Sequence, residues 1–127
     1  MAFYDPDLPG PAPARGYLIT AGQFSDVAAQ EMHRPPGRTL DLNPVLRHGR
    51  ARLGPGRYET LLCLGRRDGH PMLTFTAPWP ATEVAHTTPA PAYLAMVRTG
   101  LLQSHGTDAD LTAPQRSSPT RCLPPGR

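Results

Sequence analysis

One stretch of the sequence, ETLLCLGRRDGHPMLTFTA at residues 59–77, constrains the fold more than any other. Asp68-Gly69 stands there between two apolar runs, and a type I′ turn needs positive φ at both central positions, which these two residue types tolerate. The stretch therefore predicts a β-hairpin with a two-residue loop. That loop sets the expected register: Leu64 with Leu73 and Leu62 with Phe75 on one face, Cys63 with Thr74 and Leu61 with Thr76 on the other.

The best helix candidate runs from Ala21 to about Met32, after a short apolar strand expected at residues 16–20. Thr20 precedes it and Gln23 follows three residues on, which is the capping-box pattern. Projected at about 100° per residue, one face carries a stripe expected to be core: Phe24, Val27, Ala28 and Met32. Glu31 falls on the same face, so the only glutamate of the helix is aimed at the core.

The remaining segments contribute two further helices to a single domain at residues 16–106. Residues 43–52 predict a short helix with Pro44 tolerated in its first turn. Residues 92–106 predict a second amphipathic helix, with apolar residues at helical spacing: Tyr93, Leu94, Val97, Leu101 and Leu102. Residues 1–15 are proline-rich and irregular, and residues 107–127 have the composition of a disordered tail.

Composition narrows the classes of partner. The 127 residues carry a net charge of +3, and all thirteen basic residues are arginines, scattered without aromatic interleaving. A nucleic-acid interface would gather them on one face, so no nucleic-acid partner is expected. No apolar run approaches the length of a membrane span, and no leader pattern is present. The sequence predicts a cytoplasmic protein, with Cys63 and Cys122 as reduced thiols.

The order of these elements resembles the γ-glutamylcyclotransferase-like family over roughly residues 16–106. The likeness rests on a helix ending in DVAAQEM, a GRYET strand, the D-G hairpin and a PAPAYL…GL helix. The segments QFSDVAAQEM, LGPGRYETLLCLG and LTFTAPW look more closely like an actinobacterial branch of small proteins that are often labelled histone deacetylase. The resemblance implies an α+β fold, a small β-barrel or mixed sheet with flanking helices.

The resemblance also implies a metal-free, cofactor-independent lyase acting on a small γ-glutamyl-type amide. Glu31 takes the position of the family's general base, which deprotonates the substrate's α-ammonium so that the amine attacks the side-chain carbonyl and 5-oxoproline leaves. Such a base needs a partly desolvated carboxylate, so Glu31 is expected in an enclosed cavity against the 59–77 hairpin. The alternative is a helix-end glutamate that reaches solvent or pairs with Arg34. Tyr58 either lines the substrate pocket or simply packs.

One departure from the family pattern keeps a second interpretation open. The family's tyrosine-glycine-serine-asparagine loop has no counterpart in the sequence, so the domain is expected to be incomplete at its N-terminus. The chain is then either a cyclotransferase-like enzyme or a non-catalytic, truncated remnant that binds a small ligand or a partner, with its oligomeric state open. The deacetylase label has no support, because the five histidines form no H-x-H, H-E-x-x-H or C-x-x-C pattern for zinc.

Overall fold

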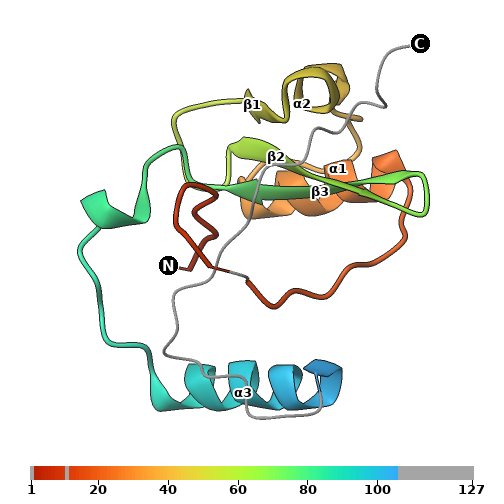
Figure 1. The fold of residues 1–127 in the computed structure, drawn as a ribbon. Coiled ribbons are helices and arrows are strands. Elements are labelled where there is room, and N and C mark those ends of the chain that lie inside the picture. The colour runs from red at the N-terminus through yellow and green to blue at the C-terminus, as the bar shows by residue number, and fades with distance from the viewer. Residues whose placement is uncertain (1, 11, 106–127) are drawn as a thin grey trace.

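The computed structural model describes residues 2–10 and 12–105. Two helices precede three strands, and two helices follow them: α1 (Ala21–Glu31), α2 (Asn43–His48), β1 (Arg50–Arg52), β2 (Thr60–Arg67), β3 (His70–Thr76), the short 3₁₀ helix η1 (Ala81–Glu83) and α3 (Pro91–His105) (Figure 1). The strands form one antiparallel sheet in the order β1-β2-β3. The α+β class is therefore confirmed. The sheet is open, and the strands of the described residues do not close into a barrel.

Helix α1 begins and ends close to where the sequence predicts. Its capping box is present, because the Gln23 backbone N–H donates to Thr20 Oγ1 at 3.1 Å and the Thr20 N–H donates to Gln23 Oε1 at 2.9 Å. The helix packs on the sheet through a compact core: Phe24, Ala28, Met32, Val45, Leu61 and Cys63. Val27, expected in that core, is 46% exposed. It projects about 100° from the centre of the buried arc, which Ala28 occupies, so the apolar stripe is narrower than predicted.

The hairpin forms at the predicted turn, with positive φ at Asp68 (50°) and Gly69 (80°). Its register is not the predicted one. Arg66 pairs with Pro71 but Cys63 pairs with Leu73, so Leu64 and Gly65 together face one residue of β3. This β-bulge, eased by the positive φ of Gly65 (118°), shifts the pairing by one residue and exchanges the two faces of β2. The core cluster accordingly includes Leu61 and Cys63 rather than Leu62 and Leu64.

Two other predicted elements differ from the structure. The helix expected at residues 43–52 ends at His48, because Gly49 adopts a left-handed conformation (φ 78°) and closes the helix by donating to the Val45 carbonyl at 2.8 Å. The chain then continues as β1. Residues 16–20, expected as a strand, are extended but pair with no strand of the described residues. The tail predicted to be disordered lies outside the described residues.

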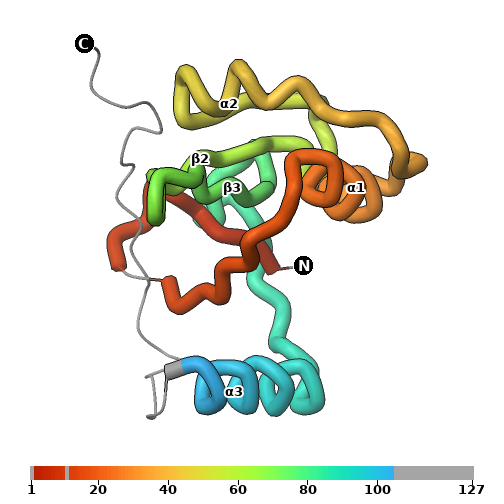
Figure 2. Tube along the Cα trace, turned by 90° about the vertical axis from the view of Figure 1, so that its right-hand side faces the viewer, coloured from red at the N-terminus to blue at the C-terminus, as the bar shows by residue number. Residues whose placement is uncertain are grey.

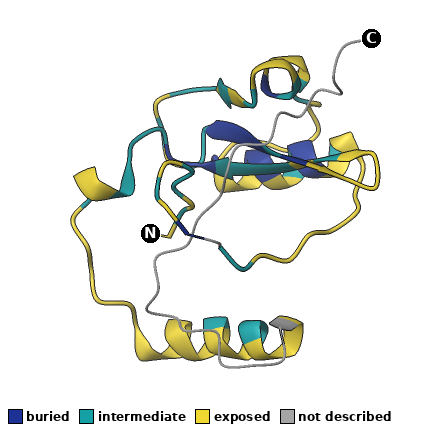
Figure 3. Cartoon of the chain, viewed as in Figure 1, coloured by how far each residue is buried: buried dark blue, intermediate teal, exposed yellow. Residues whose placement is uncertain are grey.

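Helix α3 forms as predicted and lies apart from the sheet, with residues 12–20 running between the two (Figures 1 and 2). From Pro91 to Ser104 its side chains are exposed or half-buried, in contrast to the buried inner side of α1 (Figure 3). A hydrogen bond joins α3 to residues 12–20: Arg15 Nη2 donates to Ser104 Oγ at 2.6 Å. Among the described residues, no helix is long and apolar enough to cross a lipid bilayer.

Candidate functional site

Glu31 is the last residue of α1, and its side chain is exposed. The prediction that it lies in an enclosed cavity is therefore wrong. The helix turns Ala28 and Met32 toward the sheet, which leaves Glu31 beside the buried arc rather than within it. The alternative pairing with Arg34 does not form either. The Arg34 guanidinium instead donates to Glu59 Oε1 at 2.5 Å.

Tyr58 lies two residues before β2 and has a strained backbone conformation. Its φ of 61° lies in the left-handed region, which costs a bulky residue about 1–3 kcal/mol. Two contacts hold the side chain. Its hydroxyl donates to the Ala2 carbonyl at 2.6 Å, and its ring meets Phe75 edge-on, with centroids 5.9 Å apart and planes at 79°. Phe75 in turn lies 6.4 Å from Phe24. Aromatic packing therefore links Tyr58 to α1.

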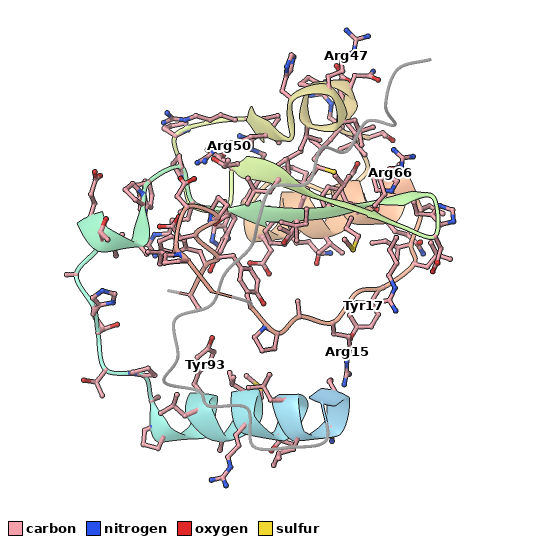
Figure 4. The ribbon with its side chains drawn as sticks, viewed as in Figure 1. Arg15, Tyr17, Arg47, Arg50, Arg66 and Tyr93 are labelled. Atoms are coloured by element: carbon pink, nitrogen blue, oxygen red, sulfur yellow. The ribbon has the colours of Figure 1, made fainter. Side chains whose placement is uncertain are left out.

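The two predicted site residues, Glu31 and Tyr58, interact electrostatically. Burial raises the pKa of the Tyr58 phenol above its ordinary value of 10.0, and the charge of Glu31 raises it further, followed by Tyr93. The hydroxyl therefore stays protonated at neutral pH. Tyr93, which sequence reasoning treated only as part of a helix face, points from α3 toward the rest of the fold (Figure 4). Glu31 of α1 and Tyr93 of α3 thus both act electrostatically on Tyr58, which lies in the turn before β2.

The Glu59 carboxylate accepts two hydrogen bonds that stabilise the loop before β2. Its Oε2 accepts from the Gly56 backbone N–H at 2.6 Å, and its Oε1 accepts from Arg34. These two contacts lower the pKa of Glu59 below its ordinary value of 4.5, the Gly56 bond contributing most. In the sequence, Glu59 is only the first residue of the 59–77 stretch that predicts the hairpin. The pair of glycines five and three residues before it is the signal that it caps a tight loop.

The cysteine and metal expectations have different outcomes. Cys63 is buried and disulfide-bonded in the structure, so the prediction of a reduced thiol is wrong at this residue. Within residues 2–10 and 12–105, histidine, cysteine, aspartate and glutamate side chains form no group of three that could hold a metal ion.

Comparison with protein-family models, with curated proteins and with solved structures finds no match for this chain.

Proposed function

We propose that the chain is a γ-glutamylcyclotransferase-like lyase that releases 5-oxoproline from a γ-glutamyl amide, with Glu31 as general base. One observation carries the proposal: Tyr58, selected from the sequence as substrate contact, is linked through Phe75 to Phe24 of α1, the helix that ends at Glu31, and the Glu31 charge raises the pKa of the Tyr58 phenol. The three strands would then be part of the family's small β-barrel.

The chemistry assigned to these residues balances without a metal or a cofactor. The Glu31 carboxylate takes a proton from the substrate's α-ammonium, and the freed amine attacks the γ-carbonyl carbon. The ring closes, the original amide C–N bond breaks, and the departing amine receives the proton that Glu31 had taken. The second proton lost by the attacking nitrogen also passes to the released amine, which leaves as an ammonium. In this scheme the neutral Tyr58 hydroxyl, whose one proton is donated to the Ala2 carbonyl, contacts the substrate as a hydrogen-bond acceptor.

The exposure of Glu31 favours a second candidate function, namely a non-catalytic protein that binds a small ligand or a partner. An exposed carboxylate is not desolvated, and burial is what raises a glutamate toward the basicity that general-base chemistry uses. In this second function Glu31 is a surface residue, and its replacement leaves binding unchanged.

A substrate pair separates the two functions. The chain is incubated with a γ-glutamyl amide and with the matching α-glutamyl amide, and 5-oxoproline is quantified. In the α-linked substrate the amide is on the α-carboxyl group, so cyclisation onto the side chain leaves that amide intact and frees no 5-oxoproline. Release from the γ-linked substrate alone supports the lyase. No release from either, by a chain shown to be folded, contradicts it and leaves the binding function.

A further inference from the structure

The open end of the β2–β3 hairpin, opposite its turn, carries two buried threonines. Thr60 begins β2 and Thr76 ends β3, and the two residues are cross-strand partners, so their side chains lie on the same side of the sheet. The next pair along the strands, Leu61 and Phe75, belongs to the core that packs against α1. Because successive side chains of a strand alternate, both threonines lie on the side of the sheet away from α1.

Residues 2–5 run over this end of the hairpin and form neither helix nor strand (Figure 1). Three hydrogen bonds join them to the rest of the fold: Thr76 Oγ1 to the Tyr4 carbonyl, Tyr58 Oη to the Ala2 carbonyl at 2.6 Å, and the Ala81 backbone N–H to Asp5 Oδ2 at 2.7 Å. In each bond the rest of the fold supplies the donor and residues 2–5 supply the acceptor oxygen.

Residues 2–5 are held in the way that a bound peptide is held. None of their side chains is buried, and Tyr4 is 45% exposed. Two of the three hydrogen bonds end on main-chain carbonyls, which every peptide carries, and the third ends on the Asp5 carboxylate. The three donors therefore recognise a main chain together with one acidic side chain.

Thr60 shows that residues 2–5 do not use every group at this end of the hairpin. Its Oγ1 is buried and has no hydrogen-bond partner in the described structure. Most buried side-chain polar atoms in proteins are paired, and an unpaired one costs free energy. Tyr58 beside it has a strained φ of 61°, and such strain gathers at ligand-binding sites. The hairpin end thus has the features of a site that is only partly filled.

The charge beside residues 2–5 also suits an acidic occupant. Asp7 follows Asp5 at a spacing of two residues, and the Arg50 guanidinium of β1 lies 4.0 Å from Asp7. The first carboxylate therefore meets a backbone N–H and the second meets a cation. Neither of these groups can accept a hydrogen bond, so both favour an acceptor-rich, negatively charged peptide.

We propose that the open end of the hairpin is a binding site for an acidic peptide of a partner protein, and that residues 2–5 are its internal occupant. The partner's carbonyls take the protons of Tyr58 and Thr76, its carboxylate takes the Ala81 N–H, and a further acceptor pairs with Thr60. Residues 2–5 can be displaced, because a segment with no buried side chain belongs to the low end of local stability. This binding needs no 5-oxoproline release and goes beyond the lyase.

Fluorescence anisotropy of a labelled peptide tests the proposal on the full chain. The peptide has the sequence of residues 2–8, with fluorescein at its N-terminus and an amide at its C-terminus. Asp5→Ala weakens the internal occupant, so the Asp5→Ala chain should bind the peptide. Wild type should bind it at least about 10-fold more weakly, because its own segment competes at a high effective concentration. A peptide that itself carries Asp5→Ala should also lose about 10-fold or more, since hydrogen bonds to an ionised group are the stronger ones.

Two hydroxyl deletions in the Asp5→Ala chain locate the binding site. Thr76→Val and Tyr58→Phe each remove one donor and should weaken peptide binding by about 2–10-fold, the usual net value of one hydrogen bond. Thr74→Val is the matched control, because Thr74 lies two residues earlier on the same side of β3. It should leave the affinity unchanged. Circular dichroism of each variant shows that the chain is folded.

Three results overturn the proposal: no peptide binding by the Asp5→Ala chain, equal binding by wild type and by the Asp5→Ala chain, or an affinity that neither Thr76→Val nor Tyr58→Phe changes. None of these results depends on 5-oxoproline release, so failure of the peptide site and failure of the lyase are distinguished.

Discussion

The Arg34 guanidinium donates to the Glu59 carboxylate at 2.5 Å, joining the segment that follows α1 to the residue that precedes β2. The glutamate side chain is 12% exposed, whereas the arginine side chain is 44% exposed. Glu59 also accepts from Gly56 at 2.6 Å, so one carboxylate fixes both the loop before β2 and the exit from α1. Because Arg34 pairs with Glu59, it does not form the alternative ion pair with Glu31.

The contacts of Glu59 predict that stability falls in acid. Because hydrogen bonding holds its folded-state pKa below 4.5, the stabilisation is present above the unfolded-state pKa and is lost as the pH falls through the folded-state pKa. Glu59→Gln should lower the unfolding midpoint at neutral pH and reduce its decline below pH 4.5. Urea unfolding across this range measures both, and an unchanged acid profile in Glu59→Gln would contradict the assignment.

The loop around Glu59 predicts that Gly54 does not tolerate a methyl group. A Cβ at Gly54 would lie 2.3 Å from Glu59 Oε2, and this carboxylate cannot swing away without losing its bonds. Gly54→Ala should therefore cost about 1–3 kcal/mol, the usual range for overpacking. Gly16→Ala is the control, since a Cβ there meets nothing within 4 Å. In a Glu59→Ala background the free-energy cost of Gly54→Ala should largely vanish, because the clashing carboxylate is gone. An undiminished cost would show that the added methyl group clashes with something other than Glu59.

Tyr58 predicts a loss of stability in alkali. Its folded-state pKa is raised above 10.0, so its stabilisation is complete below that value and is lost as the pH rises through the folded-state pKa. Tyr58→Phe keeps the ring contact with Phe75 and removes the ionisable group. The variant should be less stable than wild type at neutral pH, through loss of the Ala2 hydrogen bond, by about 0.5–1.5 kcal/mol. The difference should shrink above pH 10.0, and a constant difference would show that Tyr58 is not the group responsible.

Leu61 tests whether the bulged register is correct. The structure buries Leu61 completely against α1, and Leu61→Ala should cost about 2–5 kcal/mol, a large part of a domain's usual ~5–15 kcal/mol. Leu18→Ala, at an 82% exposed residue, should cost little. Urea unfolding of the two variants measures both costs. A small cost of Leu61→Ala would contradict the bulged register and support the register without the bulge, in which Leu62 takes the place of Leu61.

Local signals were enough to predict much of this fold. The capping box fixes the start of α1, the Asp68-Gly69 pair fixes the turn, and Pro44 fixes the first turn of α2. The bulge was not predictable, because an apolar residue on either face of β2 satisfies the pattern and only packing against α1 chooses between Leu61 and Leu62. The exposure of Glu31 was missed for a related reason. Helical periodicity gives the direction of a side chain but not the width of the buried arc, which depends on the sheet beneath it.

The measurement that tests the central claim most directly is the rate of 5-oxoproline release by Glu31→Gln, compared with wild type and with Glu83→Gln. Glutamine keeps the shape of the side chain and removes its basicity, and Glu83 is an exposed glutamate of η1 that serves as the matched control. Loss of a general base costs about 10²–10⁴-fold, so Glu31→Gln should fall by that factor while Glu83→Gln keeps the wild-type rate. An equal rate in wild type and Glu31→Gln would place the base elsewhere and contradict the account.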